Sequence, residues 1–469
     1  MLFSGIPFLY YFLPAVLIVY YLTPASWRNS VLFLASLIFY GWGGGGYLLL
    51  MLILIGAGYI FSQLIQSCKE RKKEGWAKGI LILALGTDLG VLGYYKYADF
   101  FLDNLNRLTG LSLPLLKLSL PIGISFYTFQ LMSYTIDVWK GEIRAGKNPL
   151  FLAVYVAMFP QLIAGPIVRY SDIELQLKKR EISVFQLASG IRRFIFGLAK
   201  KVLLANVLGE ICTGFKAAEE KDVLFFWLYA VSFMLQIYFD FSGYSDMAIG
   251  LGKLLGFSFP ENFRHPYGAK SITKFWRRWH ISLGSWFRDY VYIPLGGNRV
   301  NKIRWIRNLL IVWFLTGFWH GAAWNFILWG LYFAAFLAAE KLWRKKEKRR
   351  RGLGAHLYVL VTVMVSFLIF DASSLAEAGI NIRGLVGLEG AGLFSVQSIY
   401  YLRSYFITLG IAAVGAAELP ARLIEKIKEN TGGKGLIGVL EAPVLIGLFL
   451  LATAYLAEGS FNPFLYFRF

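Results

Sequence analysis

The sequence predicts an all-α, polytopic membrane protein with about ten to twelve transmembrane helices, plus re-entrant and interfacial helices. Of its 469 residues, 57% are hydrophobic and 17% aromatic, and the mean hydropathy is +0.55. Ordinary soluble domains are roughly 45–50% apolar. Residues 1–27 contain no charged side chain, and neither do residues 29–68. Since one crossing of the hydrocarbon core needs about 20 apolar residues, these stretches are long enough for several spans.

Candidate spans follow one another along most of the chain. The first lacks a basic region before its apolar run, so it is interpreted as a span and not as a cleaved signal. The stretch at 79–97 contains Asp88. The stretch at 308–321 is short for a crossing, so we expect it to be re-entrant or to end in a cavity. The predicted spans are 6–22, 30–42, 47–66, 79–97, 119–138, 149–168, 222–240, 308–321, 323–342, 356–371, 402–418 and 436–457.

Two segments depart from this pattern. Residues 184–215 mix apolar residues with paired arginines and paired lysines at helical spacing. That spacing predicts a helix that lies along the membrane interface or packs over the bundle. Residues 258–307 are rich in Trp, Arg and Gly and have no long apolar run. We expect a site loop with short helices there, because irregular backbone near a membrane is tolerated where it is buried in protein or lines a cavity.

The net charge of +20 follows from short basic loops and does not indicate nucleic acid. The basic clusters lie at residues 69–73, 178–180 and 344–351, between predicted spans. The positive-inside rule places such loops on the cytoplasmic face, where they also contact anionic lipid headgroups of the bilayer. Cys68 and Cys212 are distant from each other in apolar surroundings, so neither a disulfide framework nor a metal site is expected.

The histidines are the candidates for chemistry. His320 lies within residues 308–339, an otherwise uncharged stretch. A charged group at membrane depth costs a few kcal/mol on insertion scales, and imidazole exchanges protons near neutral pH. His280 follows two arginines, whose charges would help to keep its ring neutral. Either residue is also compatible with a core histidine that binds a backbone carbonyl. His265 and His356 are expected to take no part in chemistry.

No covalent catalytic motif is present. The chain has no Gly-x-Ser-x-Gly elbow, no P-loop and no His-Glu-x-x-His zinc motif, and two histidines forty residues apart are a poor metal site. General-base catalysis remains, in which a neutral histidine deprotonates a hydroxyl that attacks an activated acyl group. The second histidine or a tryptophan N–H would bind the developing oxyanion. The supporting residues predicted around His320 and His280 are Trp276, Trp279, Trp319, Asp240, Asp246 and Asn325.

The two carboxylates in this set have two interpretations. Asp240 and Asp246 lie in or beside a predicted span, where carboxylates usually pair with a cation or with hydrogen-bond donors. They either orient an arginine or a histidine, or belong to a buried network that fixes the positions of helices.

Several long blocks of the chain resemble the membrane-bound O-acyltransferase family, in its bacterial alginate O-acetyltransferase branch. The resemblance extends over residues 1–345, which we therefore interpret as the catalytic membrane core, with residues 346–469 as C-terminal helices that complete the bundle. The blocks are LPIGISFYTFQLMSYTIDVW (120–139), PQLIAGPIVRY (160–170), QIYFDFSGYSDMAIGLGKLLGF (236–257), FPENFRHPY (259–267), FWRRWHISLGSWFRDYVYIPLGGNR (275–299) and LTGFWHGAAWNFILWG (315–330).

The resemblance implies a helical fold around a central catalytic tunnel. The essential histidine of the family falls on His320, and its second position, a His or Asn, falls on His280. The branch implies acetyl transfer from cytoplasmic acetyl-CoA, a substrate and not a bound cofactor, to hydroxyls of an exported polysaccharide such as alginate. It also implies a bacterial cytoplasmic membrane and a separate extracytoplasmic SGNH-type acetyltransferase partner.

A group of cations is predicted to hold the phosphates of CoA at the cytoplasmic mouth. Snorkelling to lipid headgroups would explain the same residues. They are Lys274, Arg277, Arg278, Arg288 and Arg299.

Two other functions compete with this interpretation. The D-alanyl transferase of teichoic acid modification shares the two-histidine plan but takes its acyl group from a carrier protein. A polytopic transporter, from a different class, explains the spans and the buried polar groups but not the blocks rich in His, Trp and Arg.

Overall fold

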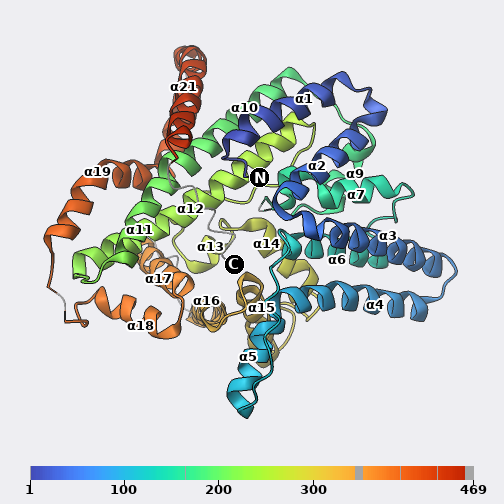
Figure 1. Ribbon diagram of the computed structural model, residues 1–469, viewed down its shortest axis with the longest axis horizontal. Coiled ribbons are helices and arrows are strands. Elements are labelled where there is room, and N and C mark those ends of the chain that lie inside the picture. Colours follow the sequence, from blue (N-terminus) through green and yellow to red (C-terminus); the bar gives the residue numbers. More distant parts are fainter. Residues whose placement is uncertain (1, 164, 344–351, 391, 430, 460–469) are drawn as a thin grey trace. The chain divides into compact units, whose positions relative to one another are not determined.

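The predicted all-α architecture is confirmed. The computed structural model describes residues 2–163, 165–343, 352–390, 392–429 and 431–459, and every regular element in these ranges is a helix (Figure 1). The basic cluster predicted at residues 344–351 lies outside them. The chain divides into two compact units. Unit 1 is Met1–Phe194 with Met247–Pro260, and unit 2 is Ile195–Asp246 with Glu261–Phe469. The predicted division at residue 345 stays a prediction.

Unit 1 contains the N-terminal helices. Helices α10 (Val184–Ala199) and α12 (Val223–Leu254) have residues in both units. The other elements of unit 1 are η1 (Phe8–Phe12), α1 (Leu13–Leu22), η2 (Ala25–Trp27), α2 (Arg28–Gly44), η3 (Gly45–Tyr47), α3 (Leu48–Glu70), α4 (Glu74–Leu92), η4 (Gly93–Tyr97), α5 (Ala98–Thr109), α6 (Ile124–Lys140), α7 (Pro149–Ala157), α8 (Phe159–Leu162) and α9 (Tyr170–Lys178).

Helix α6 is the centre of unit 1. It is buried around almost its whole circumference, which is typical of a helix enclosed by others. Helices α3 and α4 lie beside it (Figure 1). Gly58 of α3 permits this approach, because a Cβ there would lie 2.8 Å from the Leu131 side chain of α6.

Unit 2 contains both histidines that the sequence analysis selected. Its elements after α10 are η5 (Lys200–Asn206), α11 (Val207–Ala217), η6 (Pro266–Gly268), α13 (Ile272–Trp276), α14 (Ile281–Phe287), η7 (Arg288–Tyr292), α15 (Lys302–His320), α16 (Trp324–Trp343), α17 (Leu353–Asp371), α18 (Leu375–Gly384), α19 (Val396–Ala416), α20 (Leu419–Glu429) and α21 (Thr431–Ala457).

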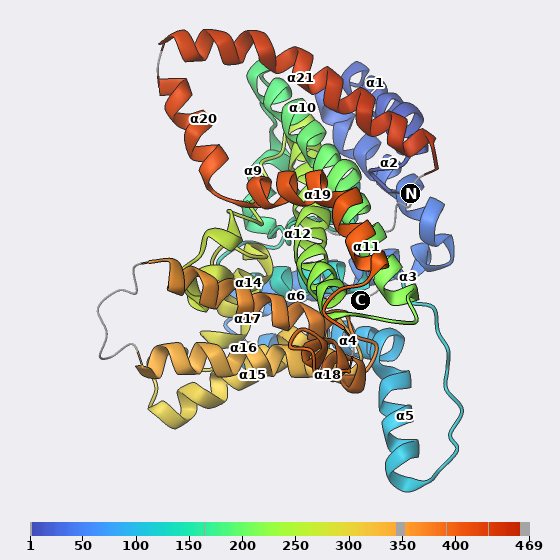
Figure 2. The same cartoon turned by 90° about the vertical axis from the view of Figure 1, so that its left-hand side faces the viewer.

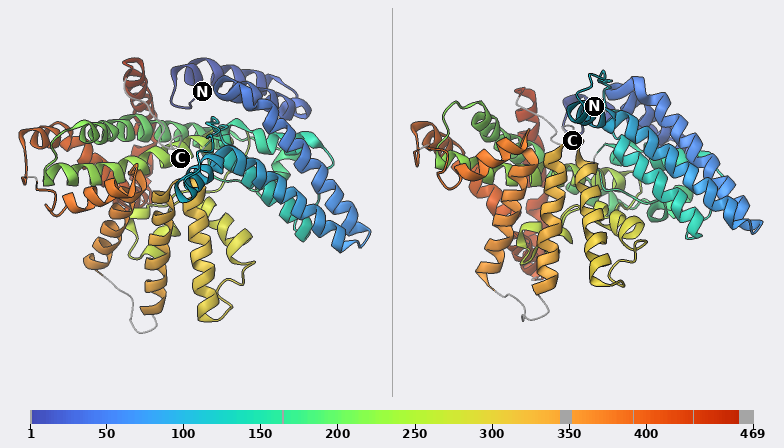
Figure 3. Two further views of the ribbon diagram at one scale, coloured as in Figure 1. Left: turned by 60° about the horizontal axis from the view of Figure 1, so that its bottom comes forward. Right: turned by 90° about the horizontal axis from the view of Figure 1, so that it is seen from below.

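Helices α15, α16 and α17 stand side by side (Figure 3), and α19 lies against α11 (Figure 2). The contact between α15 and α16 depends on two glycines. An added Cβ at Gly317 would meet the carbonyl oxygen of Phe326, and one at Gly330 would meet that of Trp313. Small residues let membrane helices approach this closely.

Seven helices among the described residues are long and apolar enough to cross a membrane, and Phe8–Leu22 is a shorter apolar helix. The predicted total of ten to twelve crossings stays a prediction. The long candidates are Gly45–Glu70, Glu74–Thr109, Val223–Leu254, Trp324–Leu342, Leu353–Asp371, Val396–Ala416 and Gly438–Ala457.

Several predicted spans differ from the observed helices; the span predicted at 222–240, for example, continues in α12 to Leu254. Two of the differences have a clear local cause. Helix α15 begins at Lys302, six residues before the predicted start, because the Asn301 side chain accepts the Arg304 N–H at 2.9 Å and caps it there. The predicted span at 149–168 is broken at Met158 between α7 and α8. Pro160 follows the break, and its ring cannot be accommodated in a continuous helix.

We expect Gly330→Ala to lower the stability of the protein by about 1–3 kcal/mol, because the added methyl group forces α16 away from the backbone of α15. Thermal denaturation of the detergent-solubilised protein would measure this. Gly410→Ala in α19 is the matched control, because no atom lies within 4 Å of its added Cβ. Equal melting temperatures for the two variants would contradict the proposed helix contact.

Candidate active site

The structure brings His280 and His320 together. Their ring centroids lie 6.5 Å apart with the planes inclined at 63°, and the residues are 1% and 9% exposed. His280 precedes α14, in the polar-aromatic segment that was predicted to form a site loop, and His320 is the last residue of α15. Two imidazoles from separate parts of unit 2 therefore share one buried space.

The backbone of His280 is strained. Its φ of 44° and ψ of 53° are left-handed, a conformation that costs a non-glycine residue about 1–3 kcal/mol and clusters at functional sites. Asn262, in the loop before η6, stabilises this backbone conformation. The Asn262 carbonyl accepts the Ile281 N–H at 3.0 Å, and its Oδ1 lies 3.2 Å from His280 Nδ1.

The same Asn262 oxygen defines the protonation of the ring. It also accepts the N–H of Ser282 at 3.2 Å and the hydroxyl of Ser282 at 2.9 Å, so it acts as an acceptor. His280 Nδ1 must then carry the hydrogen, which leaves Nε2 with a lone pair. Burial lowers the pKa of His280 to about 3, because desolvation disfavours the charged ring. His280 is therefore neutral and presents an acceptor.

His320 lies in an aromatic enclosure. Its ring contacts Trp319 and Trp329, each with centroids 5.0 Å away, and Phe370 at 5.3 Å. The residue ends α15, and the carbonyl end of a helix stabilises a positive charge beside it. An imidazole in this position is suited to accept a proton. Gly321 follows it because a Cβ there would collide with the ring of Phe326.

A column of aromatic rings extends from this enclosure. Trp276 in α13 contacts Trp313 at 4.6 Å and Trp329 at 5.6 Å, and Trp329 contacts His320. Trp276 is followed directly by Arg277. The column thus connects the predicted cationic region with the predicted base through side-chain contacts within unit 2.

The other predicted supporting residues occupy distinct positions. Trp319 contacts both histidine rings, at 5.0 and 6.1 Å. Trp279 packs in the core against Phe275 at 5.5 Å, with no ring contact to either histidine among those of the described residues. Asn325 is structural, because its Nδ2 donates to the carbonyls of Phe370 at 3.1 Å and Ala372 at 2.9 Å.

The predicted carboxylates pair with lysines. Asp240 binds Lys201 at 2.5 Å, with both side chains almost fully buried, and Asp246 binds Lys200 at 2.6 Å. Both lysines belong to η5, which lies in the segment 184–215 that was expected at the membrane interface or over the bundle. In the structure, η5 packs against α12. The pairs match the second interpretation of the two carboxylates, a buried network between helices.

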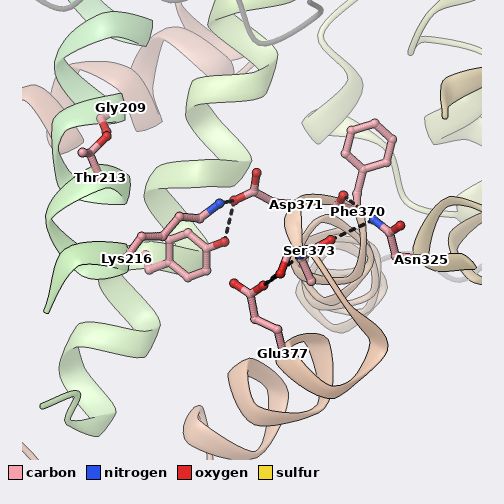
Figure 4. Close-up of polar contacts among 10 residues, drawn as sticks. Gly209, Thr213, Lys216, Asn325, Phe370, Asp371, Ser373 and Glu377 are labelled. Carbon is pink, nitrogen blue, oxygen red and sulfur yellow. Dashed lines mark hydrogen bonds and ion pairs between the residues drawn. The ribbon is translucent and has the colours of Figure 1, made fainter. Parts of the chain in front are cut away.

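A further acid with a buried side chain, Asp371, lies next to Phe370 (Figure 4). Asp371, at the end of α17, binds Lys216 at 2.5 Å and the Tyr229 hydroxyl at 2.6 Å. It directly follows Phe370, which touches His320. Together with the Asn325 contacts, this network fixes the end of α17 that forms one wall around the imidazole.

The five predicted cations are dispersed. Arg277 lines a cavity, whereas Arg278 binds Glu418 at 3.3 Å and Arg288 binds its neighbour Asp289 at 2.6 Å. Lys274 and Arg299 are exposed and do not line that cavity. The assignment of all five to CoA phosphates stays a prediction, and the structure draws attention to Arg277.

The cavity beside Arg277 has a volume of about 480 Å³. Lys341 lies 4.0 Å above the Trp305 ring and donates to the Asn298 Oδ1 at 2.5 Å. Glu340 accepts the backbone N–H groups of Ile272 and Thr273, so hydrogen bonds occupy its carboxylate. Arg277 and Lys341 thus give the cavity a positive character that suits phosphate. Its lining residues are Thr273, Arg277, Tyr292, Asn298, Trp305, Leu309, Leu337, Glu340 and Lys341.

No pattern in the sequence predicted a functional role for Asn262, Trp329, Lys341 or the lysines of η5. Asn262 lies 18 residues before His280, and no local pattern connects the two. Trp329 was treated as part of an apolar span. The sequence could have indicated only Lys200 and Lys201, because two lysines that precede two intramembrane acids are expected to form ion pairs with them.

The remaining histidines lie apart from this pair. His356 Nδ1 lies 3.3 Å from the Ala269 carbonyl, and His265 precedes η6 with a φ of 45°. Neither has a ring contact with His280 or His320 among the contacts found for the described residues.

Comparison with known proteins gives one family. The family model described as the membrane-bound O-acyltransferase family matches residues 47–349, a range that contains both histidines, Asn262 and Trp329. A protein of Azotobacter vinelandii with the name "Probable alginate O-acetylase AlgI" is 39% identical over the full length of both chains.

Two further relatives extend the range of names. The "Peptidoglycan O-acetyltransferase" of Helicobacter pylori is 36% identical over 84% of this chain and 81% of its own length. The "Teichoic acid D-alanyltransferase" of Bacillus subtilis is 29% identical over 52% of this chain and 65% of its own. All of these names denote acyl transfer.

Burial of His280 makes the folding stability of the protein depend on pH. Its pKa of about 3 in the folded protein lies below the value of about 6.5 in an unfolded chain. Stability from this group is therefore complete above about pH 6.5 and is lost toward pH 3, by up to about 1.4 kcal/mol per pH unit. We expect His280→Asn, which tolerates the left-handed backbone, to flatten the decline of the melting temperature below pH 6.5. An unchanged decline would contradict this assignment.

Proposed function

The chain belongs to the membrane-bound O-acyltransferase family and is a multi-pass membrane acyltransferase, and on this basis we propose that it transfers acetyl groups from cytoplasmic acetyl-CoA to hydroxyls of an exported or cell-surface polysaccharide. The pair His280 and His320, 6.5 Å apart in a buried aromatic enclosure, is the observation that carries the chemistry. The full-length relatives with alginate O-acetylase names support an alginate-like acceptor.

The reaction needs no covalent intermediate on the protein, because a thioester is already activated. His320 takes the proton of the acceptor hydroxyl while its oxygen forms a bond to the thioester carbon. The carbonyl electrons move to oxygen, and the tetrahedral intermediate then collapses and breaks the carbon–sulfur bond. The thiolate takes the proton from the His320 imidazolium, so the products are an acetyl ester and free CoA thiol.

His280 contributes as a neutral acceptor. Asn262 fixes its hydrogen on Nδ1, so Nε2 is free to receive a hydrogen bond from the acceptor sugar. This would orient the hydroxyl toward His320, and orientation of reactants accounts for a large share of enzymatic rate.

The donor would enter at the cavity of Arg277 and Lys341. The cavity lies near the start of α15, and His320 ends the same helix, about 22 Å from Trp305 by helical rise. The positive-inside rule places the basic flanks of α15 and α16 on the cytoplasmic side. A phosphate-bearing donor held at this end would extend its flexible arm along the aromatic column to the imidazole.

The predicted membrane location and the predicted partner protein are part of the same proposal. The bacterial relatives support a location in the bacterial cytoplasmic membrane. An extracytoplasmic SGNH-type partner would receive or direct the acetyl group toward the polymer.

The two competing functions have less support. Membership of an acyltransferase family sets the transporter aside. The D-alanyltransferase relatives match only about half of this chain, whereas the alginate O-acetylase relatives match all of it.

Replacement of His320 by Ala should reduce acetyl transfer by about 10²–10⁴-fold, because it removes the general base. The measurement is acetylation of alginate oligosaccharides by membrane vesicles supplied with acetyl-CoA. His356→Ala is the matched control and should keep its activity, because this ring lies against the Ala269 carbonyl and away from the site. Full activity of a stably folded His320→Ala variant would refute the mechanism.

Substitution of Arg277 by Ala should raise the KM for acetyl-CoA about tenfold and leave kcat unchanged, because one charge-assisted hydrogen bond to phosphate is worth about 1.5–3 kcal/mol. Arg299→Ala removes an exposed cation outside the cavity and should leave KM unchanged. If both variants keep the KM of the wild type, the donor does not bind in this cavity.

A further inference from the structure

We propose that the indole N–H of Trp329 donates a hydrogen bond to the carbonyl oxygen of the bound thioester and stabilises its negative charge in the tetrahedral intermediate. This inference rests on the proposed function. It adds a catalytic residue in α16 to the histidine pair and identifies the group that occupies the oxyanion position.

Trp329 lies directly beside the proposed base. Its ring lies edge-on to that of His320, with centroids 5.0 Å apart and planes at 83°. The rings of Trp276, Phe333 and Phe370 also pack around the indole, with centroids 5.2–5.6 Å from its own. The side chain is therefore held in one orientation beside the base, as preorganised catalysis requires.

The N–H of this indole is unused by the protein. Within the part of the chain that the structure describes, Trp329 Nε1 is buried and has no hydrogen-bond acceptor. A buried donor without a partner costs about 1–3 kcal/mol, and such groups in native proteins call for a specific explanation. Phenylalanine would avoid the cost of the unpaired donor, but its smaller ring would leave part of this buried site unfilled.

His280 cannot supply the donor. In its neutral form the ring carries a single hydrogen, and the Asn262 Oδ1 accepts it on the Nδ1 side. His280 Nε2 therefore offers a lone pair, which repels an oxyanion. An oxyanion formed beside His320 therefore needs a different N–H donor, and the indole of Trp329, whose ring lies 5.0 Å from that of His320, offers one.

The electron movements assign one role to each group. As the hydroxyl oxygen adds to the thioester carbon and His320 takes its proton, the carbonyl π electrons become a lone pair on oxygen. Trp329 binds that lone pair and keeps its own hydrogen throughout. Collapse of the intermediate restores the carbonyl and releases the thiolate, which is protonated by His320.

The test is Trp329→Phe, which keeps an aromatic ring and removes the N–H. We expect kcat to fall about a hundredfold, in line with the loss of one oxyanion donor, while the KM for acetyl-CoA stays near the wild-type value. The smaller ring leaves a cavity in the core, so the melting temperature falls as well. The assay follows release of CoA thiol by the full-length protein in vesicles with alginate oligosaccharides. If the variant folds poorly, benzothienylalanine at position 329 preserves the bicyclic shape without the N–H.

Trp227→Phe is the matched control. The Trp227 indole donates to the Leu385 carbonyl at 2.9 Å, so its loss should lower stability and leave kcat unchanged. Wild-type kcat in Trp329→Phe, or a hundredfold loss in Trp319→Phe alone, would overturn the assignment. If the wild-type protein releases no CoA, the proposed function fails, and this inference fails with it; activity in the wild type with no change at position 329 refutes the inference alone.

Discussion

The hydrogen bond between Asn262 Oδ1 and His280 Nδ1 is the constraint on which the site depends. It compensates for a left-handed backbone at His280, fixes the tautomer of the ring and leaves the lone pair on Nε2. Without it, neither the conformation nor the protonation of the second histidine would be defined. The chain segments that carry Asn262 and His280 can serve this purpose because both residues are buried within unit 2, where polar groups find partners in place of water.

The sequence contained enough information for the fold class and for the two histidines, because both depend on local signals. Long uncharged stretches indicate spans, and an imidazole within one of them is conspicuous. The partners of these residues depend on contacts distant in sequence. Asn262 reaches His280 across 18 residues, and Trp329 reaches His320 by the antiparallel packing of two helices. A tryptophan in an apolar helix has no feature in the sequence that separates packing from catalysis.

The cationic residues illustrate the same limit. Five basic side chains close in sequence were expected at one mouth, but Glu418, 140 residues away, binds Arg278, and Asp289 binds Arg288. Composition shows how many charges a segment carries and does not show which are neutralised. Arg277 is distinguished by its place beside Lys341 in a cavity whose acid, Glu340, is engaged by backbone N–H groups. Only the three-dimensional arrangement separates it from its neighbours.

The lysine–aspartate ion pairs have a consequence for how the protein is made. Asp240, Asp246 and Asp371 are each bound to a lysine that precedes them in the chain, namely Lys201, Lys200 and Lys216. Synthesis proceeds from the N-terminus, so each acid enters the bilayer after its counter-ion has been translated. An isolated carboxylate in hydrocarbon is costly. Because of this order, the lysine that pairs with each of the three aspartates is already present when the aspartate is inserted. Insertion of α12 and α17 is thereby coupled to the helical segment that bears the lysines.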